Sequence, residues 1–231
     1  MVIRHLARVF LADGPPAATA RFLADLADAA QKPDYMPMQI TEVAPTGLVP
    51  RAGLANADRS VTILWRGESI DLECAIATQP LVDFCKLALS VLPSVMRKYG
   101  RKGVRLALVR EELPELASPS PSGTAQRLLA ASLLAGGQEP FEWDVRVART
   151  EDRAFGQHRE STNSIMSVHR GVVVRVNSTE PEDRIRYSTD VNTLPAQKEP
   201  RFSDADAADF FEKSADWHSS LEGAILQHIR P

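Results

Sequence analysis

Residues 61–76 carry the signature of a β-hairpin. A run of β-branched and aromatic residues, Val61 to Trp65, is separated by a turn at 66–69 from a second run, 70–76, in which apolar residues stand at every other position. A period of two places alternate side chains on opposite faces of a sheet. The chain therefore contains at least one antiparallel strand pair with one buried face and one polar face.

The same two periodicities predict the other elements. Apolar alternation and β-branched runs predict strands over 2–12, 104–109, 141–147, 162–169, 171–177 and 184–192. Three-to-four spacing predicts helices over 16–30, 80–99, 124–135 and 203–229, with a kink in the second at Pro93. Residues 33–58 read as a loop around an edge strand at 38–43, and Gly171 as a tight turn.

The order of these elements favours an α+β fold. Strands come in groups, without the regular alternation of strand and helix that produces a parallel sheet. We expect an antiparallel sheet, or sheets, with packed helices, and a long C-terminal helix whose apolar stripe includes Phe210, Trp217 and Leu221 lying across the sheet. Residues 1–231 are interpreted as a single domain. Two βα halves joined near 117–123, by descent from an internal duplication, remain the open alternative.

Charge and cysteine content limit which cellular compartments and which classes of partner are expected. The chain has 27 basic and 30 acidic residues and a formal net charge of −3, so it is no polycation made for generic nucleic-acid or membrane-surface binding. Its two cysteines are too few for a disulfide framework. No apolar run approaches the roughly 20 residues of a membrane span. We therefore expect a cytoplasmic protein without membrane association.

No local motif for catalysis, metal binding or cofactor binding stands out. The five histidines, His5, His158, His169, His218 and His228, lack metal-site spacing, and nucleophile elbows and phosphate-binding loops are absent. We assign no catalytic residue, metal or cofactor. Asp71 and Glu73, at alternate strand positions, could bind a cation, but the solvent-facing side of a sheet is the better interpretation of this pair. A site assembled in space from His169, His218 and Asp190 stays open.

One segment is unusually basic. Six cations fall within fourteen positions: Arg97, Lys98, Arg101, Lys102, Arg105 and Arg110. They could bind nucleic acid or another anionic partner, since guanidinium groups present paired donors to such oxygens. The simpler interpretation, which we prefer, is that they decorate a helix C-terminus and a solvated turn.

Several stretches together resemble an uncharacterised, sporadically distributed family of bacterial cytosolic proteins. They are the hairpin segment 62–67 (TILWRG), the strand 103–110 (GVRLALVR), the late strand 187–192 (YSTDVN) and Trp217-His218 in the last helix. The resemblance covers about residues 38–230. It implies a similar architecture and a bacterial origin, and no catalytic residue.

The leading functional hypothesis is a non-catalytic binding or adaptor protein that acts through a macromolecular interface, with a protein partner or a second copy as the other side. The sporadic distribution of the resembled family suggests an accessory system such as antiviral defence or toxin immunity. Two alternatives stay open: a nucleic-acid-associated subunit of a larger complex that uses residues 97–110, and an enzyme with a spatially assembled site.

Overall fold

The computed structural model describes residues 2–14, 19–44, 47–75, 79–114, 121–130, 134, 140–174 and 180–229. The strands are β1 (Val2–Leu11), β2 (Met36–Ala44), β3 (Gly47–Ala55), β4 (Val61–Arg66), β5 (Ser69–Ala75), β6 (Gly103–Glu112), β7 (Trp143–Phe155), β8 (His158–Val174) and β9 (Pro181–Thr193). The helices are α1 (Ala20–Ala30), α2 (Leu81–Lys98), α3 (Pro121–Leu128) and α4 (Asp204–Ile229).

All the strands join one antiparallel sheet, which confirms the α+β class. The sheet has nine strands in the described part of the chain, in the order β2-β3-β4-β5-β1-β6-β9-β8-β7. This order is nearly symmetric about the central pair β1 and β6. On each side a central strand leads through a helix to a meander that returns beside it, and a second helix follows.

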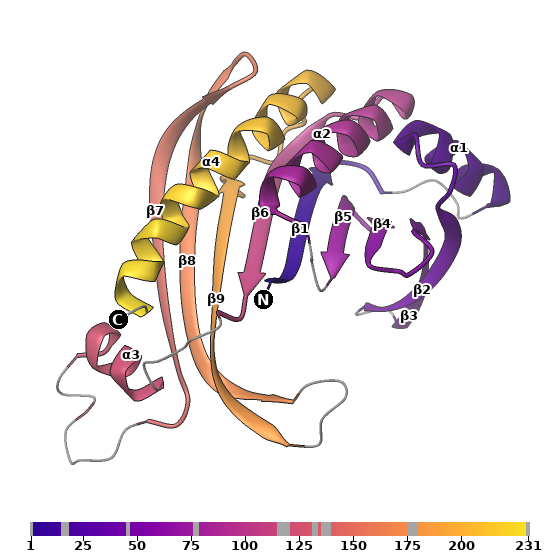
Figure 1. Ribbon diagram of the computed structural model, residues 1–231. Coiled ribbons are helices and arrows are strands. Elements are labelled where there is room, and N and C mark those ends of the chain that lie inside the picture. The colour runs from indigo at the N-terminus through magenta and orange to yellow at the C-terminus, as the bar shows by residue number, and fades with distance from the viewer. Residues whose placement is uncertain are drawn as a thin grey trace.

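The helices share one side of the sheet. Figure 1 shows α1, α2 and α4 lying across the strands as one layer. The main core lies between this layer and the sheet, and its largest fully buried side chains include Trp65, Phe84 and Phe210. A smaller cluster, in which Trp143, Tyr187 and Ile225 are buried, lies beneath α3 and the end of α4.

The C-terminal helix lies on the sheet as the apolar stripe predicts. Phe210 and Leu221 are fully buried, and the ring of Phe210 contacts that of Trp217 with centroids 5.5 Å apart. Its first turn is closed by a capping box, in which the backbone N–H of Ser203 donates to Oδ2 of Asp206 at 2.8 Å. The helix is therefore fixed at its N-terminus and along its length.

Two strand assignments from the sequence were wrong. The segment predicted as a loop over 33–58 with one short strand contains the hairpin β2–β3. Its prolines are tolerated because β2 is an edge strand and β3 pairs with β4 only over Gly53–Ala55. The predicted turn at Gly171 lies inside the single strand β8. A Cβ on Gly171 would come within 2.5 Å of Nε2 of His169, so a larger residue here would require the His169 ring to move.

Other element boundaries moved as well. The strand predicted to end at 147 continues as β7 to Phe155, and α3 begins at Pro121, inside the predicted connector 117–123. Residues 117–120 of that connector, and most of 131–139, lie outside the described residues. The helix containing Pro93 continues through it. Packing of neighbouring elements decided these limits, which local periodicity alone does not determine.

Candidate functional site

The sheet side that faces away from the helices has charged residues at its centre. On β1 the odd-numbered residues from His5 to Leu11 face the helical layer, so the even-numbered ones face the other way. We call this other side the open face. Over the central strands it consists of Arg4, Leu6, Arg8, Phe10, Leu64, Arg66, Asp71, Glu73, Arg105, Val109, Glu111, Asp190 and Asn192. Within the described ranges, the helices pack on the opposite side.

A buried carboxylate organises one part of the open face. Asp71 on β5 is 1% exposed, and Arg8 on β1 donates to it from Nε at 2.7 Å and from Nη2 at 2.6 Å. Arg66 on β4 lies 3.1 Å from the same carboxylate, and the Ser69 hydroxyl donates to it at 3.0 Å. Burial works against the charge of Arg8, yet the hydrogen bonds to Asp71 and its negative charge raise the pKa of this guanidinium. The negative charge of Asp71 is thus balanced by the guanidinium groups of Arg8 and Arg66, so this carboxylate needs no metal ion as a counter-charge.

Arg4 forms a second paired site on the same strand. It donates to Glu111 on β6 at 2.8 Å and lies 3.8 Å from Glu73 on β5. Strand register brings these residues together. Arg4 lies directly opposite Glu111 on β6, and Glu73 lies diagonally across from Arg4 on β5, two residues from its direct partner Ala75. The carboxylates on this part of the open face therefore already have cationic partners.

Arg105 on β6 differs from these arginines. Its guanidinium carbon lies 4.8 Å from the centroid of the Phe10 ring, and Arg8 approaches the same ring at 5.4 Å. Among the described residues, no hydrogen bond or ion pair reaches Arg105, and its Nε is buried without a partner. Burial lowers the pKa of Arg105, although the charge of Asp190 opposes this. Within the described part of the chain, the side chain is a half-buried cation without a contacting counter-ion.

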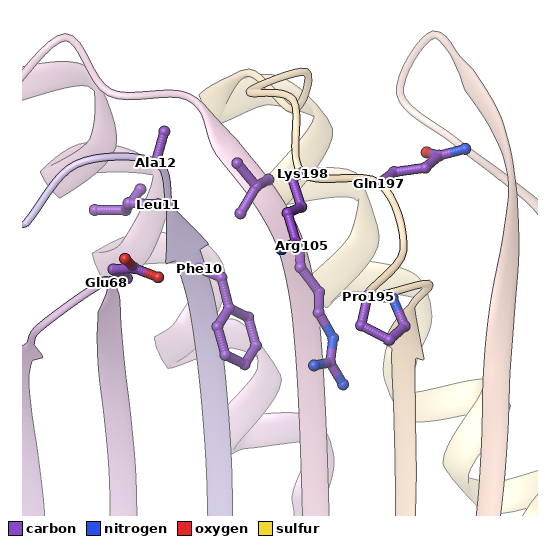
Figure 2. Close-up of a pocket in the computed structure, with 9 residues that line it drawn as sticks. Phe10, Leu11, Ala12, Glu68, Arg105, Pro195, Gln197 and Lys198 are labelled. Atoms are coloured by element: carbon purple, nitrogen blue, oxygen red, sulfur yellow. The ribbon is translucent and has the colours of Figure 1, made fainter. Parts of the chain in front are cut away.

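Arg105 lines a pocket at the end of the central strands. The pocket has a volume of about 390 Å³ and is lined by Phe10, Leu11, Ala12, Glu68, Val104, Arg105, Pro195, Gln197 and Lys198. Figure 2 shows the side chains of Phe10, Arg105 and Pro195 side by side, with the guanidinium between the two rings. Lys198 and Glu68 are exposed and add one charge of each sign. The pocket thus combines apolar walls with a cation that its described neighbours leave unpaired.

Asp190 on β9 is an open-face carboxylate whose ionised form is disfavoured by burial. Burial raises its pKa, while a hydrogen bond from Asn192 at 2.9 Å and the charges of Arg105, Arg146 and Arg8 oppose the shift. Asn192 is itself fully buried. A carboxyl group with a raised pKa favours the folded state only when it is protonated.

This gives a pH-dependent prediction for Asp190. Because its pKa is raised on folding, the ionised form destabilises the fold, and the penalty grows as pH rises above the unfolded value near 4. Asp190→Asn should therefore be more stable than wild type in urea unfolding at pH 7, with a smaller difference at pH 3.5. The exposed Asp144 on the same face provides the control, since Asp144→Asn should change little at either pH. A less stable Asp190→Asn protein at pH 7 would contradict the assignment.

The six basic residues predicted as an anionic-partner site do not form one surface. Arg97 pairs with Asp204 at 2.6 Å, Lys98 lies 3.8 Å from Asp25, and Arg101 pairs with Asp13. Lys102 is exposed beside them. Arg105 and Arg110 are five positions apart on one strand and therefore lie on opposite faces of the sheet. Of the six, Arg105 is the residue that reaches the open face.

Arg110 instead belongs to a polar cluster beneath α4. It contacts Glu112 and Glu222 at 2.5 Å each, and the hydroxyl of Tyr187 lies 2.8 Å from both carboxylates. Burial and these carboxylates raise the pKa of Tyr187. The cluster joins β6, β9 and α4. We therefore interpret it as a structural contact that holds the terminal helix on the sheet.

The site suggested by His169, His218 and Asp190 is not assembled. His218 is fully buried on the helical side, where its Nδ1 lies 2.7 Å from the Thr189 hydroxyl. Asp190 follows Thr189 on β9 and so faces the opposite side, as His169 on β8 does. Burial and the charge of Arg110 lower the pKa of His218 to about 3. The sheet itself separates the imidazole from the carboxylate, which removes this constellation.

Metal and thiol chemistry gain no support from the described residues. No group of three or more His, Cys, Asp and Glu side chains gathers there in a way that could hold a metal ion. Cys74 and Cys85 are free and buried, and burial raises the pKa of Cys85 to about 12. A buried thiol with such a pKa is packing material rather than a nucleophile.

The sequence analysis missed Phe10 and Lys198 as site residues and did not connect Arg8 to Asp71. The sequence indicated these residues only in part. The alternation on 2–12 places Arg4, Arg8 and Phe10 on one face, and Asp71 and Glu73 were recognised as the polar face of their strand. That these two strands are neighbours follows from the topology alone.

Comparisons with known proteins add no family assignment. No protein-family model matches the chain, and no curated protein matches it. Among the described residues, none of the helices combines the length and the apolar character needed to cross a membrane.

Proposed function

We propose that this chain is a non-catalytic binding protein that holds a partner protein against the open face of its sheet. The observation that carries the proposal is the composition of that face. Paired side chains such as Arg8 and Asp71 are held at fixed geometry beside half-exposed apolar ones such as Phe10, Val109 and Ile165, with the described helices all packed on the other side. Interfaces between proteins commonly combine arginine and aromatic anchors with apolar contacts.

Charge favours a protein over a nucleic acid as the partner. Binding to a phosphate backbone needs several cations free to displace counterions. On the open face Arg4 and Arg8 are already bonded to carboxylates, and Asp190 and Glu73 would repel phosphates. A folded partner with charges of both signs fits this mixed surface better.

A second copy of the chain fits less well than a different protein. In two open faces placed together, Asp71 and Glu111 would be unavailable to Arg105 of the other copy, because both are already bound to arginines of their own chain. The exposed Asp144 lies on the edge strand β7, away from the central strands. The free, reduced cysteines and the resemblance to a bacterial family support a role in the bacterial cytoplasm, in an accessory system such as antiviral defence or toxin immunity.

Photo-crosslinking in the native host tests the proposal. A benzophenone amino acid at Val109, in the middle of the open face, should give one discrete protein adduct on irradiation, identified by mass spectrometry. The same amino acid at Ser220, an exposed position on α4, should give none.

Three outcomes would contradict the proposal. They are no adduct from position 109, an adduct that nuclease removes, or an adduct with the mass of two copies of the chain. The second would favour the nucleic-acid-associated alternative, and the third would show a homodimer through the open face.

A further inference from the structure

We infer that the pocket between Phe10 and Arg105 is a carboxylate-binding subsite, which receives an Asp or Glu side chain or a C-terminal carboxylate of the partner protein. This inference rests on the proposed function and names the chemistry that the partner presents at one position.

The unpaired state of Arg105 is the first argument. Four arginines lie on the two central strands, and Arg4, Arg8 and Arg110 each contact a carboxylate. Arg105 contacts none among the described residues, although its Nε is buried. The Nε atoms of Arg4 and Arg110 are also buried without a partner, so the missing carboxylate is what sets Arg105 apart, and an anion entering the pocket would supply it. The guanidinium of Arg105 therefore lacks a hydrogen-bond acceptor that a ligand could provide.

The shape and the walls of the pocket are the second argument. A volume of about 390 Å³ is at the lower end of the range for ligand pockets, enough for one side chain or a small organic acid. The ring of Phe10 holds the guanidinium from one side, and Pro195 borders it from the other (Figure 2). An occupant with apolar atoms next to its charged group would use both features.

The charge balance favours a carboxylate over a phosphate. A guanidinium presents Nε and Nη donors in a fork that matches the two oxygens of a carboxylate. Lys198 adds a second cation at the rim, but Glu68 lies there too. A single negative charge is accommodated by this set, whereas a phosphate dianion would meet repulsion from Glu68 and from the nearby Asp190.

Binding of benzoate tests the inference. Benzoate joins a carboxylate to a flat apolar ring, benzamide has nearly the same shape without the charge, and inorganic phosphate has charge without the ring. In two-dimensional NMR that observes the arginine Nε–H groups, benzoate should shift the Arg105 signal saturably, with a Kd of the order of millimolar as expected for a fragment of this size. Benzamide and phosphate should each bind at least tenfold more weakly.

Matched variants separate Arg105 from general charge. Arg105→Gln should reduce benzoate affinity at least tenfold, as followed by backbone amide shifts of pocket residues. Arg186→Gln, at an exposed arginine of β9 on the open face, should leave it unchanged. Glu68→Gln should strengthen binding about twofold, because it removes a negative charge at the rim. Phe10→Leu provides a second test of the pocket should Arg105→Gln fail to fold, and it should weaken binding several-fold.

The outcomes distinguish this inference from the proposed function. Equal binding of benzoate by wild type and Arg105→Gln, equal binding of benzamide, or tighter binding of phosphate would each overturn the carboxylate subsite. None of these results affects crosslinking from Val109, which reports on the open face as a whole. A discrete crosslinked partner together with absent benzoate binding would therefore refute the subsite alone.

Discussion

Gly156→Ala should lower the free energy of unfolding by about 3 kcal/mol, because two penalties coincide at this residue. Gly156 forms the turn between β7 and β8 at φ +56°, where an L side chain is strained. A Cβ there would also lie 1.9 Å from Oδ1 of Asp206 and 3.0 Å from its Cα. The turn is fastened to α4, since the Gly156 N–H donates to Asp209 at 2.5 Å and the Gln157 N–H to Asp206 at 3.1 Å. The substitution therefore disturbs the turn and the start of the terminal helix together.

Gly100→Ala provides the matched control. Gly100 has nearly the same conformation, φ +59°, but a Cβ on this residue would meet no described heavy atom within 4 Å. The substitution should cost only the backbone strain, about 1 kcal/mol. Urea unfolding followed by circular dichroism measures both variants. Equal losses would show that the contact with Asp206 contributes nothing and that the turn is free to move away from α4.

Arg110→Met should destabilise the protein by about 3–5 kcal/mol, the range found when one member of a buried ion pair is removed. The side chains of Arg110, Glu112 and Glu222 are 14%, 16% and 20% exposed, so the two carboxylates would lose their cation with little water to replace it. Because Glu222 belongs to α4, the loss should also loosen the helix from the sheet. Chemical denaturation gives the size of the effect, and hydrogen exchange of α4 amides gives its location.

Two comparisons make this prediction specific. Arg105→Met, on the same strand but the opposite face, removes a cation that contacts no carboxylate among the described residues and should cost less than about 1 kcal/mol. The double variant Arg110→Met with Glu222→Met should be less destabilised than the sum of the single variants, by about 1–3 kcal/mol. Additive losses would mean that Arg110 and Glu222 do not interact, contrary to their short contact.

The local elements could be predicted where one periodicity dominated. The hairpin around 66–69, the long helix α2 and the capped terminal helix are each specified within a single stretch of chain. Prediction failed where the local signal competed with packing. Prolines hid the edge hairpin β2–β3. Charged residues hid the second half of β7, where Arg149 and Arg153 both pair with Glu151 at the sheet edge.

The candidate site could be predicted only as separate residues. Arg105 stood out as part of a basic segment. The odd spacing of Arg105 and Arg110 on one strand already places them on opposite faces, but only the structure shows what each of them contacts. Arg8 and Asp71 lie 63 positions apart, and Arg110 and Glu222 lie 112 apart. Contacts at such separations depend on which strands become neighbours, and no periodicity encodes this.

The amino-acid sequence by itself determined the α+β class, the antiparallel hairpins and which residues of each strand share a face, because side-chain periods of 2 and 3.6 act within a few residues. Only the tertiary structure decided that β1 and β6 pair at the centre, that the described helices cover one side, and that Arg105 lies beside Phe10 and Pro195 with no carboxylate contact from the described residues. The physical reason is that strand order depends on how distant segments bury their apolar faces together. That burial is a property of the whole chain.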